Sequence, residues 1–307
     1  MSAIFNGIPG LEAWTSLREI QAGWSSDKKY CIQDQHGREM LLRLADISQY
    51  ERKKREFEAV KQLKQHAELP MSRPVDFGIC NEGHSVYSLF TWVEGEDARG
   101  VISKLPPSEQ YRLGLKAGEI LRVMHEIPAP SQTPSWAERY NAKIDKYIAN
   151  YRASGFHLKG EDKVLSYIEG HRCLLDQRPL TFQHGDYHIG NMIVTRAGEL
   201  GIIDFNRMDY GDPWEEFNRI TWCANESAEF ASGRIHGYFQ GEVPETFFKL
   251  MALYIACNQI ASIPWAIPFG EAEVNYMLER AEQVLEYYNG FESWVPSWYL
   301  PSRDLLL

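Results

Sequence analysis

The sequence is poor in cysteine, and its cysteines form no pattern typical of a metal site or a disulfide framework. Five of them are scattered through 307 residues without a C-x-x-C pair: Cys31, Cys80, Cys173, Cys223 and Cys257. An odd, dispersed set is typical of reduced thiols, so neither a zinc site nor disulfides are expected. The first ten residues also lack the basic patch and apolar core of a secretory signal peptide. Both observations favour a cytoplasmic protein.

Long apolar runs are missing as well. The best candidate, residues 250–267, contains Asn258, Gln259 and Pro264. A membrane-spanning helix needs about 20 consecutive, predominantly apolar residues. The segment is therefore predicted to form a buried helix followed by a loop, and no membrane partner is expected.

Basic residues are outnumbered by acidic ones. The chain has 32 Lys and Arg against 42 Asp and Glu, which gives a net charge of −10. A general nucleic-acid-binding protein would carry a basic stripe, so no nucleic-acid partner is expected. A negative protein can attract cationic small molecules, so the charge is compatible with a small, cationic partner. Apolar and charged contents of 44% and 24% are those of an ordinary globular protein with one large domain or two modest ones.

Residues 184–204 form the most informative segment. They read His-Gly-Asp-Tyr-His-Ile-Gly-Asn, an apolar run at 192–194, a polar turn at 196–199, a second apolar run at 200–203, and Asp204. This pattern predicts a short β-hairpin, whose two ends lie together. Asn191 and Asp204 are therefore expected side by side. Two oxygen ligands so placed suit one Mg²⁺, which completes its coordination with water and substrate phosphates.

Asp186 lies five residues before Asn191 on the same loop. From there it could accept a proton from a hydroxyl group while the metal holds a nucleotide's phosphates. An Asp-x4-Asn spacing followed by a metal-binding Asp is, in outline, the arrangement of protein kinases. The alternative is that Asp186, Asn191 and Asp204 only cap turns, as Asp and Asn often do.

Three ordered motifs then make a resemblance specific. His-Gly-Asp-x4-Asn at 184–191, Ile-Ile-Asp-Phe at 202–205 and Gly-Asp-Pro at 211–213 resemble the aminoglycoside phosphotransferase (APH) family of small-molecule kinases. The resemblance implies an α+β, protein-kinase-like bilobal fold, with a small β-rich N-terminal lobe containing one main helix and a large, mostly helical C-terminal lobe. Residues 1–94 would form the nucleotide-binding lobe, with a hinge at residues 90–96, and residues 97–307 the catalytic and substrate-binding lobe.

The pattern of the N-terminal part agrees with this architecture. Strands are expected at residues 30–33, 39–44, 75–80 and 85–90, and a charged helix at 52–65. In the second strand a period of two puts Leu41 and Arg43 on one face and the intervening apolar residues on the other. Farther along, helices are expected from Ser108 as N-cap, at 138–154 and at 161–176.

The resemblance also implies the nucleotide contacts. Arg43 stands where kinases have the lysine that holds the α- and β-phosphates, and Glu56 where they have the glutamate that pairs with that lysine. The phosphate-covering loop would contribute Ser25 and Ser26, although it has one glycine where protein kinases have three. Backbone groups of the hinge would bind the purine edge, at Thr91, Trp92 and Val93. The alternatives are that the loop with Ser25 and Ser26 is a plain hairpin turn, that Arg43 is a surface arginine, and that Glu56 is a solvated helix glutamate.

Four further residues take roles by resemblance only. His184 would hold the backbone of the catalytic loop, and Asp212 would brace that loop through hydrogen bonds. The family commonly continues Gly-Asp-Pro with x-x-Asp, where this chain has Glu216. Glu216 and Glu226, among the many aromatic residues after position 214, would suit a cationic sugar.

These features predict transfer of the γ-phosphoryl group of ATP or GTP, with Mg²⁺, to a hydroxyl of a small molecule. The resemblance favours an aminoglycoside-type antibiotic as acceptor, and hence a role in antibiotic resistance. Other acceptors on the same fold remain alternatives: a macrolide, choline, homoserine, a thio-sugar or a sugar amine. So does a non-catalytic pseudokinase, suggested by Arg43 and the glycine-poor loop. A protein acceptor is disfavoured because Gly211 follows Asp204 too closely for a long activation segment.

Overall fold

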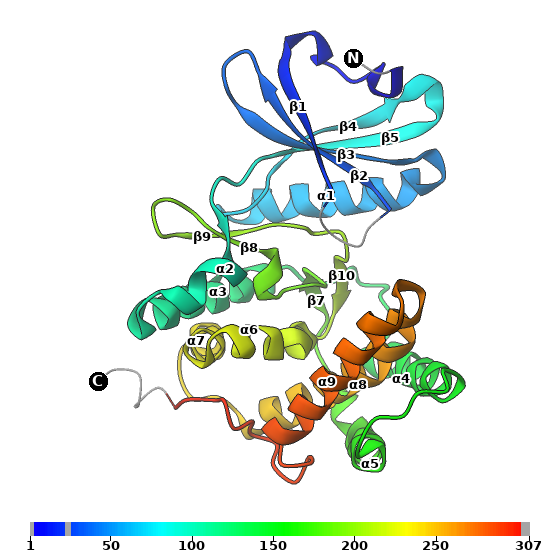
Figure 1. The fold of residues 1–307 in the computed structure, drawn as a ribbon, viewed down its shortest axis with the longest axis vertical. Helices are drawn as coiled ribbons and strands as arrows, with labels where there is room; N and C mark the ends of the chain where they lie inside the picture. Colours follow the sequence, from blue (N-terminus) through cyan, green and yellow to red (C-terminus); the bar gives the residue numbers. More distant parts are fainter. Residues whose placement is uncertain (1–2, 22–25, 302–307) are drawn as a thin grey trace. The chain divides into compact units, whose positions relative to one another are not determined.

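The computed structural model describes residues 3–21 and 26–301, and the chain divides into two compact units. The first comprises Met1–Asp97 and Asn191–Met208, and the second Ala98–Gly190 and Asp209–Leu307. Figure 1 labels their helices and strands. Residues 191–208 therefore belong to the first unit, whereas the sequence predicts residues 97–307 as the second lobe.

The first unit is built on a five-stranded antiparallel sheet with the order β1-β2-β3-β5-β4. Its strands are β1 (Trp14–Ile20), β2 (Lys28–Asp34), β3 (Glu39–Asp46), β4 (Pro74–Cys80) and β5 (Ser85–Thr91). The strands predicted at residues 30–33, 39–44, 75–80 and 85–90 are confirmed as β2, β3, β4 and β5, and each is slightly longer than expected. Gly37, with φ of 75° in the turn between β2 and β3, adopts the left-handed conformation that glycine reaches without steric cost.

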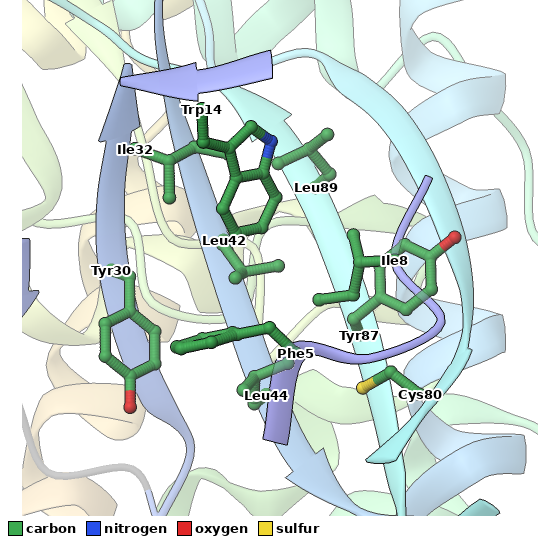
Figure 2. Packing of buried hydrophobic residues seen from close by; sticks show 10 residues of the cluster. All are labelled: Phe5, Ile8, Trp14, Tyr30, Ile32, Leu42, Leu44, Cys80, Tyr87 and Leu89. Atoms are coloured by element: carbon green, nitrogen blue, oxygen red, sulfur yellow. The ribbon is translucent and has the colours of Figure 1, made fainter. Parts of the chain in front are cut away.

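One face of this sheet carries a hydrophobic cluster. Its buried members are Phe5, Ile8, Trp14, Tyr30, Ile32, Leu42, Leu44, Cys80, Tyr87 and Leu89. Figure 2 shows the ring of Phe5, from the short turn η1 (Ala3–Phe5), lying among Tyr30, Leu42 and Leu44. The period of two in β3 therefore holds, since Leu42 and Leu44 point into the cluster and leave Arg43 to the opposite face.

Helix α1 (Tyr50–His66) packs by its buried side against β4 and β5. Phe57 on this helix contacts Phe77 and Phe90, with ring centroids 5.4 and 5.6 Å apart. The predicted charged helix is confirmed, with its inner apolar residues at the expected spacing.

The first unit also contains the predicted hairpin, formed by β8 (Met192–Val194) and β9 (Leu200–Ile202). A short strand, β6 (Glu96–Asp97), extends it to three strands in the order β6-β8-β9. Two backbone hydrogen bonds tie β9 to the segment before β4, from Ser72 N to Ile202 O and from Ile202 N to Pro70 O.

The second unit is mostly helical. Its helices are α2 (Ala98–Val101), α3 (Pro107–Met124), α4 (Trp136–Ala153), α5 (Glu161–His171), α6 (Ile220–Glu226), α7 (Ala228–Phe239), α8 (Glu245–Ala266) and α9 (Glu271–Tyr287). A two-stranded antiparallel sheet pairs β7 (Thr181–Gln183) with β10 (Asp209–Gly211). Short 3-10 helices include η6 (Arg172–Leu175), η7 (Ile189–Asn191), η8 (Pro213–Arg219) and η9 (Ile267–Phe269). The α+β class predicted from the sequence is confirmed.

Helices α3 and α7 pack closely through glycine. A Cβ atom on Gly118 would lie 2.1 Å from Arg234 O, and one on Gly237 would lie 2.0 Å from Leu115 O. Only a residue without a side chain allows the two backbones to approach so closely. The start of α3 differs from the prediction: Pro106 is the N-cap and Pro107 the first helical residue. Proline suits that position because its fixed φ is already helical, so Ser108 lies inside the helix.

Helix α8 corrects the expectation of a helix followed by a loop. It runs without a break through Asn258 and Gln259 and includes Pro264. Pro264 lies in the last turn, so it removes the one backbone hydrogen bond that its N–H would have donated to the carbonyl of Ile260, and the helix ends two residues later. With η9, the segment Glu245–Phe269 is long and apolar enough to cross a membrane by composition alone, and 67% of its most apolar window is buried inside the unit. That burial is what a core helix would show.

Candidate active site

The two ends of the hairpin meet as the sequence predicted. Ile203 N donates to Asn191 O at 3.1 Å, directly after the last β8–β9 pair, Met192 with Ile202. Asn191 therefore accepts the hydrogen bond that closes the hairpin, and Asp204 directly follows its donor. Asp204 has φ of 66°, a left-handed conformation that is uncommon for residues other than glycine and is found often at functional sites.

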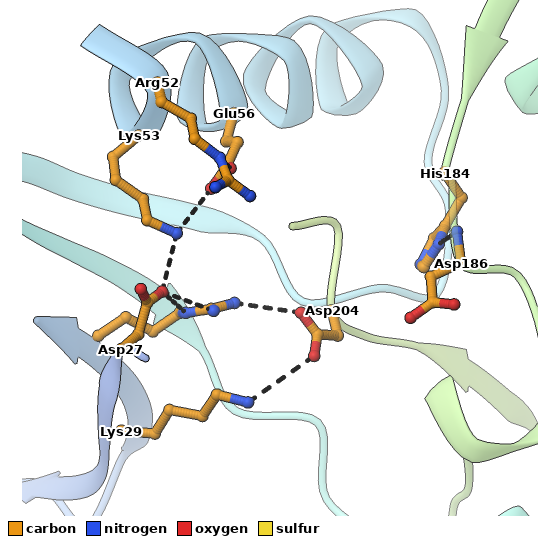
Figure 3. A network of polar contacts seen from close by, with 9 residues as sticks. Asp27, Lys29, Arg52, Lys53, Glu56, His184, Asp186 and Asp204 are labelled. Atoms are coloured by element: carbon orange, nitrogen blue, oxygen red, sulfur yellow. Dashed lines mark hydrogen bonds and ion pairs between the residues drawn. The ribbon is translucent and has the colours of Figure 1, made fainter. Parts of the chain in front are cut away.

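The carboxylate of Asp204 contacts two cations from the sheet (Figure 3). Arg43 Nη1 lies 3.2 Å from Asp204 Oδ1, and Lys29 Nζ lies 3.8 Å from Asp204 Oδ2. Lys29 and Arg43 are direct partners in the β2–β3 register, so antiparallel pairing puts both side chains on one face. Sequence analysis had singled out Arg43 but not Lys29, which the strand register could have identified.

The pairing expected between Arg43 and Glu56 is wrong in this structure. Arg43 instead binds Asp27, through Nη2 at 2.7 Å and Nε at 3.2 Å from Oδ2. Glu56 accepts from Lys53 at 3.0 Å and from Arg52 at 2.9 Å. Lys53 and Glu56 are three residues apart and share one face of α1. Glu56 therefore pairs with Lys53 of its own helix instead of with Arg43 on β3.

Asp27, Lys29, Arg43, Lys53, Glu56 and Asp204 together form what we call the charge cluster of the first unit. Burial alone would raise the pKa of Asp27, but Arg43 and Lys53 outweigh it and lower that pKa below its usual value. Burial lowers the pKa of Lys29, and the charge of Asp204 opposes the change. Asp27 directly precedes β2, Lys29 lies on β2 and Lys53 lies on α1, so no local sequence pattern connects them as one cluster.

The charge cluster lines part of a pocket in the first unit. Its lining includes the charged residues Arg43, Lys53, Glu56 and Asp204 and the apolar residues Leu41, Phe57, Val60, Phe90 and Phe205. A concave site with an apolar wall and a few charged groups is the usual form of a small-ligand site.

The predicted hinge residues are partly engaged within the first unit. Thr91 N donates to Arg73 O at 2.8 Å, and Thr91 O accepts from Ser72 Oγ at 2.8 Å. Trp92 N donates to Glu39 O at 3.3 Å. Val93 shows no backbone hydrogen bond to another residue in the part of the chain that the structure describes. Ser26 is exposed just before Asp27, and Ser25 lies outside the described residues.

In the second unit, the loop after β7 carries His184 and Asp186. His184 is fully buried, and its Nδ1 accepts a hydrogen bond from Asp186 N at 3.2 Å. That contact fixes the backbone of the loop next to Asp186 and is consistent with the supporting role expected for His184.

Glu216 does not lie in an acceptor pocket, which corrects its predicted role. Only 2% of it is exposed, and its carboxylate accepts from His184 N at 3.1 Å and Gly185 N at 2.7 Å. Burial raises the pKa of Glu216 to about 8, and the N–H of Gly185 opposes the change. Glu216 therefore braces the loop, and its burial keeps it from a cationic sugar. Glu226, the other candidate, is half-buried at the end of α6.

Asp186 is held by two basic side chains of its own unit. Arg219 Nη1 lies 2.9 Å and His188 Nε2 lies 3.5 Å from Asp186 Oδ1. Arg219 Nη1 also donates to Gly185 O at 3.3 Å. The His188 ring packs beside Trp222, with centroids 5.4 Å apart. Arg219 and His188 thus fix the direction of the Asp186 carboxylate, which is a property that sequence spacing did not indicate.

Asp212 is the centre of a buried hydrogen-bond network. Its carboxylate accepts from both Arg178 Nε and Nη2, at 2.7 and 3.0 Å, and from Tyr254 Oη at 2.5 Å. Its backbone oxygen accepts from Gln183 Nε2 at 2.8 Å, and Gln183 directly precedes His184. Asp212 therefore supports the loop that begins at His184 through its hydrogen bond with Gln183.

Asn191 and Asp204 have the chemistry of a Mg²⁺ site. Both supply oxygen atoms, which this ion prefers, and Mg²⁺ needs only one or two protein carboxylates because waters and phosphates complete its shell. Among residues 3–21 and 26–301 no group of three or more His, Cys, Asp or Glu forms a candidate metal site. Asn191 and Asp204 are therefore the residues that could hold Mg²⁺.

The chain matches the family model described as APH, phosphotransferase enzyme family, over residues 16–248. This match spans more than two thirds of the 307 residues and includes every motif discussed above. The chain belongs to the APH phosphotransferase family. It is therefore a phosphotransferase enzyme, as predicted from the three motifs.

Solved APH-family structures resemble this chain in fold at low sequence identity. A GDP complex of an aminoglycoside 2′-phosphotransferase-IIIa variant is 14% identical, with 92% of this chain and 94% of that chain covered and a TM-score of 0.69. The gentamicin complex of APH(2″)-IIa is 18% identical, with coverages of 92% and 94% and a TM-score of 0.64. A thermostable APH(4)-Ia variant with ADP and hygromycin B is 15% identical, with coverages of 89% and 94% and a TM-score of 0.63. The predicted protein-kinase-like APH fold is confirmed.

No curated protein sequence matches this chain. The family assignment thus comes from the family model, and the likeness to solved structures shows the fold.

Proposed function

We propose that this APH-family enzyme transfers the γ-phosphoryl group of ATP or GTP to a hydroxyl group of a small molecule. The observation that carries the proposal is the convergence of Asn191, Asp204 and Arg43, because it joins two oxygen ligands and a phosphate-binding cation in one unit. Asp186, supported by its own hydrogen bonds, supplies the remaining group that the reaction needs.

Asp186 orients the acceptor hydroxyl and receives its proton. The hydroxyl oxygen forms a bond to the γ-phosphorus while the bond from that phosphorus to the β–γ bridging oxygen breaks. The nucleoside diphosphate leaves with that electron pair, and the proton remains on Asp186. Such catalysis depends mainly on positioning and charge stabilisation, so an ordinary carboxylate serves as the base.

The nucleotide lies against the first unit in this proposal. Arg43 offers its fixed fork of N–H donors to the α- and β-phosphates, Ser25 and Ser26 contribute from the phosphate-covering loop, and the hinge binds the purine edge. Since Thr91 and Trp92 already use their N–H groups, Val93 is the best-placed hinge donor. Asn191 and Asp204 would hold Mg²⁺, which neutralises developing phosphate charge when it is bound.

The acceptor we favour is an aminoglycoside-type antibiotic, encountered in the cytoplasm. Its support is the net charge of −10, which attracts polycations, and the hygromycin B and gentamicin in the solved relatives. Glu226 is the acidic residue that we assign to the acceptor after the correction of Glu216. Macrolides, choline, homoserine and sugar amines are the competing acceptors.

The test is consumption of ATP and GTP with Mg²⁺ against a panel of these compounds, beginning with hygromycin B and gentamicin. We expect one class to stimulate nucleoside diphosphate release. Asp186→Asn should lower that rate by roughly 10²- to 10⁴-fold. Asp204→Ala should abolish both turnover and Mg²⁺-dependent nucleotide binding while the protein stays folded. Asp209→Ala, an exposed carboxylate of β10, is the matched control and should behave as the unmodified enzyme.

Each contrary result removes a defined part of the proposal. Stimulation by choline or homoserine alone would overturn the antibiotic acceptor. Normal turnover in Asp204→Ala would remove the metal assignment. If nucleotide did not bind with or without Mg²⁺, the pseudokinase alternative would replace the catalytic one.

A further inference from the structure

One oxygen atom in the first unit receives hydrogen bonds from two cations. Asp27 Oδ2 accepts from Arg43 Nη2 at 2.7 Å, Arg43 Nε at 3.2 Å and Lys53 Nζ at 2.8 Å. The three side chains are between 5% and 8% exposed. Figure 3 shows Lys53 reaching Asp27 from α1, on the side opposite Lys29. Three donor nitrogens from two cations thus surround a single anionic oxygen.

Both cations are anchored independently of Asp27. Arg43 Nη1 is bound to Asp204 Oδ1 at 3.2 Å, and Lys53 Nζ is bound to Glu56 Oε2 at 3.0 Å. If the Asp27 carboxylate moved away, each cation would keep a carboxylate partner and its direction. The oxygen site between Arg43 and Lys53 is therefore preformed, and Asp27 is its present occupant.

Charge and chain position both favour displacement of Asp27. The charge cluster contains three cations and three carboxylates, and Arg52 adds a fourth cation at Glu56, so removal of the Asp27 carboxylate leaves an excess positive charge. Asp27 lies just before β2, whose first paired residue is Lys28 opposite Leu44. Its side chain can withdraw without breaking a strand hydrogen bond.

We propose that Arg43 and Lys53 form an oxyanion site for a phosphate group of the donor nucleotide, and that Asp27 occupies this site until the nucleotide displaces it. Guanidinium and ammonium groups are the usual protein partners of phosphate oxygens. Lys53 becomes a nucleotide-binding residue, and Glu56 acts through it as a positioning residue. This inference rests on the proposed function, because it assumes a nucleotide in the first unit.

The experiment compares nucleotide dissociation constants of full-length variants, measured by titration with a fluorescent ATP analogue in EDTA and again in Mg²⁺. Lys53→Met should weaken binding by roughly 10- to 100-fold, since it removes a charged hydrogen bond. Lys53→Arg should restore most of the affinity. Asp27→Asn should tighten binding about 3- to 10-fold, because a competing charge is removed from the site. Thermal unfolding of each variant shows that it is folded.

Lys54→Met is the matched control. Lys54 is the next residue on α1, is exposed and stacks over Tyr50 rather than joining the charge cluster, so its nucleotide affinity should equal that of the unmodified protein. Glu56→Gln should weaken binding less than Lys53→Met, because the cation remains but loses its anchor.

The outcomes separate this inference from the proposed function. If the unmodified protein bound no nucleotide, the proposed function would fail. If it bound nucleotide and folded Lys53→Met bound it equally well, the oxyanion site would be overturned while the function stood. Weaker binding by Asp27→Asn would show that Asp27 supports the bound state, and would overturn its role as the displaced occupant.

Discussion

Arg219 Nη1 lies 2.9 Å from Asp186 Oδ1 and donates to the carbonyl oxygen of Gly185 at 3.3 Å. One guanidinium thus holds both the carboxylate proposed as the base and the peptide that precedes it. Arg219 follows the Gly-Asp-Pro segment as the last residue of η8, 33 positions after Asp186 in sequence. Arg219 therefore both supports the backbone of the loop and orients the Asp186 carboxylate.

Replacing Arg219 should therefore damage turnover without damaging nucleotide binding. We expect Arg219→Met to lower kcat by roughly 10- to 100-fold, since small misplacement of a reacting group can cost that much. Arg219→Lys should recover part of the rate because it keeps the charge. The readouts are kcat, KM and the nucleotide dissociation constant, with the exposed Arg112→Met on α3 as control. Equal losses in kcat and nucleotide affinity would contradict a role confined to Asp186.

The Asp212 network should dominate the stability of the second unit. Asp212→Ala leaves Arg178, whose side chain is 16% exposed, without its bidentate partner, and removes the buried acceptor of Tyr254 Oη. Breaking a buried pair from one side costs about 3–5 kcal/mol. Urea unfolding followed by tryptophan fluorescence measures the change. The surface pair of Asp209 with Arg139 provides the comparison, where Asp209→Ala should cost about 1 kcal/mol or less.

The close α3–α7 contact predicts that a methyl group added there destabilises the protein, whereas the same change at an exposed helical glycine stabilises it. Gly118→Ala puts a methyl group 2.1 Å from Arg234 O, and such overpacking typically costs about 1–3 kcal/mol or more. Gly170→Ala, in the exposed part of α5 with no atom near the added carbon, should instead stabilise by up to about 1 kcal/mol through helix propensity. Thermal midpoints that moved in the same direction for both variants would refute the close-packing account.

The buried ring of His125 should make the folded protein less stable in acid. Burial, with the charge of Arg234, lowers the pKa of His125 from 6.5 to about 3. Its Nδ1 lies 3.0 Å from Tyr238 Oη. The folded protein keeps this ring neutral, while the unfolded chain binds a proton below pH 6.5, so this contribution to stability is lost as pH falls from about 6.5 towards 3.

The measurement is the difference in unfolding free energy between pH 7 and pH 5. It should be smaller in His125→Gln than in the unmodified protein, whatever the absolute stability of the variant. His36→Gln, a change in the exposed turn between β2 and β3, should leave the difference unaltered. An unchanged difference in His125→Gln would mean that other groups cause the acid sensitivity.

The sequence by itself determined the features that depend on neighbouring residues. The hairpin of residues 192–202 and the meeting of Asn191 with Asp204 follow from local turn chemistry and strand pairing. The face of β3 that carries Arg43 follows from the period of two. The family follows from three motifs, because they lie within one short stretch of chain.

Only the tertiary structure decided the partners of the charged groups. Arg43 binds Asp27 and Asp204 rather than Glu56, and Lys53 takes Glu56 instead. Glu216 turned inward to the backbone of His184 and Gly185 rather than to a substrate. Long charged side chains reach several neighbours, and which one they bind depends on how strands, helices and loops distant in sequence are packed. That packing sets distance and burial, which together fix the strength of each ion pair.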